Sequence, residues 1–177
     1  IMSNTKILVI VAHPDLANSR INKRLAGGVV TLPNVKVEKL YLDYPDGVID
    51  VAREQEAVAA SDVIVFQFPF YWHAAPALLK EWQDKVLGLS WSSEQFRESL
   101  AAKKLLVVVT MAHAATTYLR GAENKYAVEE SMTPLRQMAD YCGMIWQTPH
   151  AIYGVKDFSD EDIDREVEEY KELLASF

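Results

Sequence analysis

Short runs of apolar and β-branched residues recur along the chain, separated by longer segments with helical spacing. The five runs occupy residues 7–11, 35–41, 63–66, 105–109 and 144–153. The first, third and fourth are apolar on both faces, as expected for central parallel strands that helices cover on both sides. The second alternates Val35 and Val37 with charged residues, which favours an edge position, and Pro149 interrupts the last. The pattern predicts one α/β domain over 1–177 with a five-stranded parallel sheet.

The segments between these runs carry the apolar stripes of amphipathic helices that face a core. Two stripes are formed by Leu78, Leu79, Trp82 and Val86, and by Ile163, Val167, Tyr170 and Leu174. Ser159 with Asp162 resembles a capping box, and Thr133 before Pro134 predicts a capped helix that ends at Gly143. Residues 112–132 show no clear element, which indicates either a functional loop or an unrecognised element.

Charge and cysteine content narrow the classes of partner and compartment. Lys and Arg number 18 against 25 Asp and Glu, and a net charge of -7 disfavours nucleic acid or an anionic membrane as the main partner. The single cysteine, Cys142, cannot form an internal disulfide and is expected as a small buried side chain at a helix end. No apolar run approaches the roughly 18 residues of a membrane span, and the start of the chain lacks a leader pattern. We therefore expect a cytoplasmic protein without membrane insertion.

Polar and aromatic residues gather where three of the predicted strands end, and ligands of open α/β sheets bind at that edge. After the first strand, Ser19 is placed to begin a helix whose N-H groups would attract an anion, with His13 or Arg20 adding charge. The alternative is that Ser19 is only a helix cap and His13 an ordinary hydrogen-bonded histidine.

The third strand runs into an aromatic segment between Pro69 and Pro76, and four neighbouring rings cannot all face the core. The prolines fix the path of this loop, which suits a planar heteroaromatic ligand. The fourth strand ends at Thr110 and enters the long loop. An anion site, an aromatic platform and a polar loop together predict a phosphorylated planar cofactor.

Several motifs occur together and in one order. They are Ala12-His13-Pro14 with Ser19 and Asn22, Tyr44-Pro45-Asp46, Glu54-Gln55-Glu56-Ala57, Pro69 through Trp72, and Pro76, Leu79, Lys80, Trp82, Asp84, Lys85 and Val86. With these motifs nearly the whole chain resembles the flavodoxin-like NAD(P)H:quinone oxidoreductase family, especially short bacterial quinone reductases ancillary to glutathione-regulated potassium efflux. The resemblance implies a three-layer α/β sandwich with strand order 2-1-3-4-5, and a homodimer that reduces quinones. It also implies a flavin, with FMN first and FAD second, and NAD(P)H as co-substrate.

The resemblance also assigns site residues. Cofactor contacts would be His13, Ser19, Arg20, Ile21, Asn22, Pro69, Phe70, Tyr71, Trp72, His73, Thr110, Met111, Ala112 and His113. The family's usual Thr-Thr-Gly-Gly appears here as residues 110–113 without glycine, which predicts a changed or strained backbone path. Tyr118 matches the family tyrosine of this loop, and Glu123 replaces a usual histidine. We therefore count Tyr118, His113 and Glu123 as candidate catalytic residues, with His113 supplying positive charge near the reduced flavin.

Two functions other than quinone reduction are alternatives for this sequence. A metal hydrolase also carries Ala-His-Pro-Asp, but His73, His113 and His150 lack the spacing of paired metal ligands, so no metal is expected. The second alternative is a flavodoxin-like regulatory subunit that docks on a potassium efflux transporter in the membrane with little catalysis. For the enzyme, one stacking site that serves donor and acceptor in turn predicts ping-pong kinetics.

Overall fold

The computed structural model describes residues 4–88 and 93–177. Residues 1–3, at the start of the chain where the sequence predicts no leader, lie outside the described residues. The strands are β1 (Ile7–Val11), β2 (Val35–Lys39), β3 (Val63–Pro69), β4 (Lys104–Thr110), β5 (Ile145–Trp146) and β6 (His150–Ile152). All pairings are parallel and the order is β2-β1-β3-β4-β5, with β6 also paired to β4. The predicted α/β fold with order 2-1-3-4-5 is confirmed, and the last run forms two short strands around Pro149.

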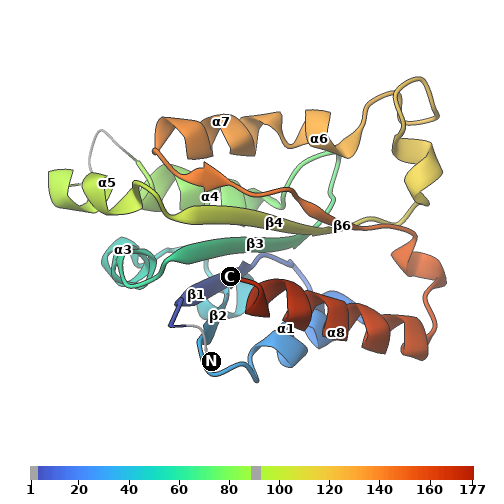
Figure 1. The fold of residues 1–177 in the computed structure, drawn as a ribbon, viewed down its shortest axis with the longest axis horizontal. Coiled ribbons are helices and arrows are strands. Elements are labelled where there is room, and N and C mark those ends of the chain that lie inside the picture. Colours follow the sequence, from blue (N-terminus) through green and yellow to red (C-terminus); the bar gives the residue numbers. More distant parts are fainter. Residues whose placement is uncertain (1–3, 89–92) are drawn as a thin grey trace.

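Helices cover both faces of the sheet (Figure 1). Their bounds are α1 (Asn22–Val29), α2 (Leu40–Asp43), α3 (Val51–Ala59), α4 (Ala77–Val86), α5 (Glu94–Leu100), α6 (Val128–Ser131), α7 (Thr133–Tyr141) and α8 (Asp160–Ala175). One face packs against α1 and α8, and the other against α2 to α7. Strand side chains alternate between the two cores, because successive residues of a strand point to opposite faces.

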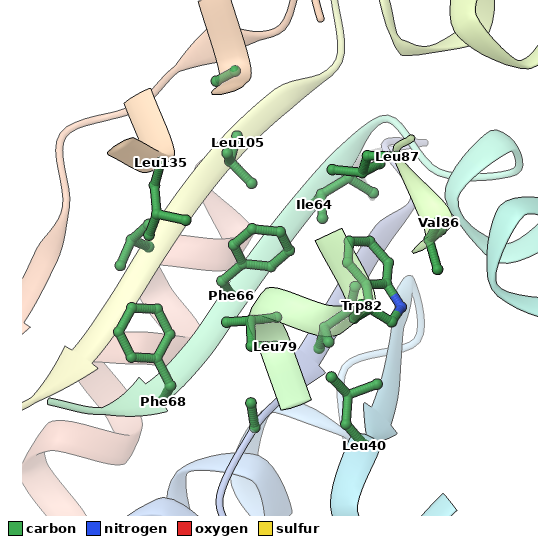
Figure 2. Close-up of a cluster of buried hydrophobic side chains, with 14 of the residues drawn as sticks. Leu40, Ile64, Phe66, Phe68, Leu79, Trp82, Val86, Leu87, Leu105 and Leu135 are labelled. Atoms are coloured by element: carbon green, nitrogen blue, oxygen red, sulfur yellow. The ribbon is translucent and has the colours of Figure 1, made fainter. Parts of the chain in front are cut away.

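The larger core lies beneath α4. Figure 2 shows Phe66 and Phe68 of β3 beside Leu79 and Trp82 of α4. The rings of Phe66 and Trp82 meet edge to face with centroids 5.6 Å apart, and both side chains are fully buried. Both predicted stripes line the cores, although Val167 is only partly buried. Burial of these large side chains holds the ends of β1, β3 and β4 in a fixed arrangement.

The second core brings α1 and α8 into close approach at Gly28. A Cβ atom at this position would overlap Cγ1 of Val167 on α8, whereas a Cβ at Gly27 would meet nothing within 4 Å. The absence of a side chain at Gly28 therefore sets how closely the two helices pack.

Several local predictions differ from the structure. The second strand ends at Lys39, because residue 40 begins the short helix α2. Residues 112–132 contain two elements that the sequence did not predict, a 3-10 turn η2 (Ala115–Tyr118) and α6. Thr133 is the first residue of α7 and makes no capping bond, so its prediction as a cap is wrong.

The other predicted helix ends are confirmed. Ser159 and Asp162 form the predicted capping box at the start of α8. Cys142 is buried at the end of α7, and Gly143 follows it with φ of +71°. In the ranges that the structure describes, no helix has the length and apolar character needed to cross a membrane.

Candidate functional site

A cavity of about 200 Å³ lies where the carboxyl ends of β1, β3 and β4 meet. It is lined by His13, Ser19, Arg20, Ile21, Asn22, Pro69, Phe70, Tyr71, Thr110, Ala112 and Val155. All but Val155 were predicted as cofactor contacts. Val155 begins the 3-10 turn η3 (Val155–Asp157), which the sequence pattern did not reveal. Three segments far apart in the sequence therefore converge at one sheet edge, as expected for parallel strands.

The loop after β1 presents free backbone donors to this cavity. The hydroxyl of Ser19 accepts the N-H of Asn22, the first residue of α1, at 3.1 Å. In the described part of the chain, the backbone N-H groups of Arg20 and Ile21 have no hydrogen-bond partner. Unpaired N-H groups at a helix start bind anions such as a phosphate without requiring net positive charge on the protein.

His13 adds a side-chain donor. Its Nδ1 accepts the backbone N-H of Asp15 at 3.0 Å, so the neutral ring carries its proton on Nε2. Burial lowers the pKa of His13 below its usual 6.5, and the nearby Asp15 opposes this shift only in part. His13 is therefore a neutral donor at physiological pH.

Arg20 connects this loop to the C-terminal helix. Its guanidinium donates to the backbone oxygen of Phe158 at 2.6 Å and to Asp160 at 3.0 Å. The pairing offsets part of its charge, so Arg20 positions the loop as well as lining the cavity. A second, open cavity of about 640 Å³ shares Ser19 and Arg20 with the first and extends along α1 past Lys23.

Beneath the cavity lies a buried polar network that crosses from β3 to β4. The side-chain amide of Gln67 donates to the backbone oxygen of Asn22 at 3.0 Å and to its Oδ1 at 3.2 Å. The side-chain amide of Asn22 donates in turn to Oγ1 of Thr110 at 2.9 Å. Gln67 was not among the predicted site residues. The signal that could have found it is a lone amide within an otherwise apolar run.

The aromatic segment after β3 forms a tight turn. Tyr71 and Ala74 exchange both backbone hydrogen bonds, at 2.9 and 3.0 Å. The two central residues, Trp72 and His73, have φ of +49° and +60°, a conformation that is costly for side chains other than glycine. Neither lines the cavity, and the Trp72 side chain is 96% exposed. The turn directs Phe70 and Tyr71 toward the cavity and Trp72 away from the protein.

The loop after β4 takes an unstrained path. Met111 is buried in the core. Its backbone N-H donates to the backbone oxygen of Ile152 at 2.8 Å, and its backbone oxygen accepts the N-H of Val155 at 3.1 Å. Ala112 and His113 form a bend, and neither has a positive φ. Of the two predicted alternatives, a changed or a strained path, the strained one is therefore wrong. His113 is exposed and outside the cavity lining.

The two remaining candidate catalytic residues lie at different depths. Tyr118 is buried, with its ring 6.1 Å from Phe70 and 5.7 Å from Tyr153. Burial raises the pKa of its hydroxyl above the usual 10, so it is neutral. Glu123 is exposed on the following loop and does not line the cavity. Tyr118 therefore lies directly behind a cavity residue, and Glu123 does not.

Comparison with known proteins agrees with this arrangement. A family model described as a flavodoxin-like fold matches residues 5–174. The chain belongs to this family. It is 39% identical over 175 residues to the glutathione-regulated potassium-efflux system ancillary protein KefG of Cronobacter sakazakii, covering 98% of this chain and 95% of that protein.

Two solved structures are also similar. General stress protein 14 of Treponema denticola, solved in complex with FMN, has a TM-score of 0.90 and 30% identity, with 97% of this chain and 98% of that chain covered. An NADPH-quinone reductase from P. pentosaceus has a TM-score of 0.85 and 27% identity, with 95% and 96% covered. The chain is thus a member of a family that includes oxidoreductases and FMN-binding proteins.

Proposed function

We propose that this protein is an FMN-dependent NAD(P)H oxidoreductase that passes hydride to a quinone or a similar planar acceptor. The observation that carries the proposal is the cavity at the strand ends, where free backbone donors of residues 20–21 face the aromatic segment that begins at Pro69. Similarity to an FMN complex and to an NADPH-quinone reductase supports it. The pairing of an anion site with a rigid apolar wall suits a phosphorylated planar ring.

The residues present fit such a group. Nε2 of His13 and the N-H groups of Arg20 and Ile21 would hold the phosphate, because all three are donors without a partner in the described chain. Phe70 and Tyr71 would line the ring system. When bound, the flavin supplies a carrier that accepts and returns hydride.

We assign a role to each candidate catalytic residue. Tyr118 would keep Phe70 in place and retain a neutral hydroxyl at working pH. We propose that His113 supplies positive charge to the reduced site from the exposed loop, with Glu123 altering the local charge in place of a histidine. The midpoint potential of bound flavin in His113→Ala tests this role, because loss of a nearby cation lowers the potential and an unchanged potential excludes the role.

Steady-state kinetics test the enzyme directly. Donor and acceptor would use the same cavity in turn, so initial-rate lines at several quinone concentrations should be parallel. Intersecting lines would exclude the ping-pong order, and absence of NADH or NADPH oxidation with quinones would exclude the activity.

Because NAD(P)H is a cytoplasmic reductant, we propose that the enzyme works in the cytoplasm.

The exposed turn at Trp72 supports the proposal of a homodimer. Trp72 is 96% and Tyr71 is 44% exposed, an unusual amount of aromatic surface beside a ligand site. A second copy that covers this turn would also cover one side of the cavity. Sedimentation of wild type against Trp72→Ser tests this, and a monomeric wild type would exclude it.

A second candidate function is that of an ancillary subunit of a membrane transporter. It is favoured by the similarity to KefG and by the position of His113 and Glu123 outside the cavity. A protein that binds flavin but does not oxidise NAD(P)H with any quinone would support this function over the enzyme.

A further inference from the structure

The direction of each hydrogen bond in the buried network follows from one unambiguous acceptor. The backbone oxygen of Asn22 can only accept, so the atom of Gln67 that lies 3.0 Å from it must be the amide nitrogen. The same nitrogen lies 3.2 Å from the end of the Asn22 side chain, which must therefore be its oxygen. Both amide orientations are thus determined by the contacts.

This orientation reaches Thr110. With its oxygen held by Gln67, Asn22 turns its NH2 group to Oγ1 of Thr110 at 2.9 Å. The hydroxyl of Thr110 must accept this bond, so its own hydrogen is left for another partner. In the chain as described, no acceptor for that hydrogen is found, and Thr110 lines the cavity.

We infer that Gln67 is a positioning residue, which acts through Asn22 to make the Thr110 hydroxyl a hydrogen-bond donor toward the ligand. Gln67 itself is fully buried and does not line the cavity. The ligand atom that faces Thr110 is then an acceptor, such as a ring carbonyl oxygen or an unprotonated ring nitrogen. The inference rests on the proposed function, since it specifies how this cavity selects a flavin.

A second observation shows that the network is not arranged for stability alone. Oε1 of Gln67 is buried and has no hydrogen-bond partner in the described structure. An unpaired buried acceptor is destabilising, and an apolar side chain of the same length would avoid it. The amide group at residue 67 is explained by the two donors that it gives to Asn22.

A double-mutant cycle on FMN affinity tests the inference. Thr110→Val removes the donor and should weaken FMN binding about five- to tenfold, the effect of one neutral hydrogen bond. In Gln67→Met, Asn22 is free to turn its side-chain oxygen toward Thr110, and the Thr110 hydroxyl then donates its hydrogen to Asn22 instead of to the ligand. This variant should weaken FMN binding about three- to tenfold. The double variant should bind as Thr110→Val does, because no hydroxyl remains to be oriented.

Thr110→Ser serves as the conservative variant, because it keeps the hydroxyl and should restore sensitivity to Gln67→Met. Val65→Ala, on the same face of β3 and also buried, controls for a general loss of stability and should not alter FMN affinity. If Gln67→Met does not fold, Gln67→Leu takes its place in the cycle, because it also lacks the amide that donates to both oxygens of Asn22 and adds no unpaired polar group to the core.

Effects of Gln67→Met and Thr110→Val that simply add would overturn the inference, because Gln67 would then act without Thr110. A wild-type protein that does not bind FMN would instead contradict the proposed function. The absorption band of bound FMN gives an independent readout. It should shift in the same direction in both single variants and no further in the double variant.

Discussion

Tyr44 donates its hydroxyl hydrogen to Oε1 of Glu54 across 2.6 Å in the core beneath α4, and Trp82 donates to the other carboxyl oxygen at 2.9 Å. Glu38 of the edge strand is the second carboxyl of this cluster, and both glutamates are almost fully buried. Burial and the neighbouring carboxyl of Glu38 raise the pKa of Glu54 to about 7. Burial acts against ionisation of Glu38 too, but the neighbouring polar and charged groups, including the Lys36 ammonium at 2.7 Å, outweigh this and lower its pKa. As the pH falls, Glu54 therefore takes up a proton before Glu38 does.

The first prediction concerns the pH dependence of stability. Glu54 titrates near 4.5 when unfolded and near 7 when folded, so between these values the folded state binds more protons. Its contribution to the free energy of unfolding is complete below about 4.5 and is lost as the pH rises toward 7. Urea unfolding across this range should show the decline, and Glu54→Gln should flatten it. The exposed Glu56→Gln on the same helix should keep the wild-type slope, and a slope unaltered by Glu54→Gln would contradict the assignment.

Two adjacent glycines of α1 provide a matched pair. Gly28→Ala should lower the free energy of unfolding by about 1–3 kcal/mol, because the new methyl group overlaps Val167 and separates α1 from α8. Gly27→Ala meets open space and should raise stability by up to about 1 kcal/mol through helix propensity. Thermal unfolding of both variants measures the difference. Val167→Ala should relieve the loss in Gly28→Ala, and equal effects at the two glycines would refute the close packing.

At the strained turn of residues 71–74, a substitution is expected to raise the free energy of unfolding. Trp72→Asn should stabilise the monomer by about 1 kcal/mol, because asparagine tolerates a positive φ better and the exposed indole loses no packing. Denaturant unfolding measures the gain. Tyr126→Asn, at an exposed aromatic residue with ordinary φ, serves as the control and should show no gain. A destabilised Trp72→Asn monomer would mean that the turn is not strained.

His13 is predicted to recognise the phosphate of the ligand. His13→Asn should weaken FMN binding by about tenfold or more, because it removes a hydrogen bond to a charged group. Riboflavin has the same ring system without the phosphate, so its affinity should change little. Fluorescence titration with both ligands measures this, and equal losses for FMN and riboflavin would place His13 away from the phosphate.

The sheet could be predicted from the sequence because its central strands are buried on both faces. The unbroken apolar run of residues 7–11 is rich in β-branched side chains and is typical of a central parallel strand that helices cover on both faces. The short elements between Ala112 and Met132 could not be predicted, since one turn of helix has too few residues to show a period. Glu38 belongs to the charged residues that alternate with Val35 and Val37 in the predicted edge strand, yet it is buried close to Glu54 of α3. Only tertiary packing reveals that pairing.

The site was predictable to the level of its loops, and less well at individual side chains. Parallel strands bring His13, Phe70 and Thr110 to one edge whatever the details of the loops. The side chains of Trp72 and Met111 depend instead on local backbone angles, which turn one outward and the other into the core. Gln67 escaped notice because its two contacts are with Asn22 at the start of α1, which only the tertiary structure brings beside it.

Mass spectrometry of the cofactor that the chain retains tests the central claim most directly. The purified protein is incubated with equal concentrations of FMN and FAD, freed of unbound ligand and denatured, and the released molecule is identified. We predict FMN in an amount that matches the protein. Release of FAD would contradict FMN as the cofactor and would indicate that the open cavity beside Ser19 holds the adenine part of FAD. Release of no flavin would contradict the proposed function.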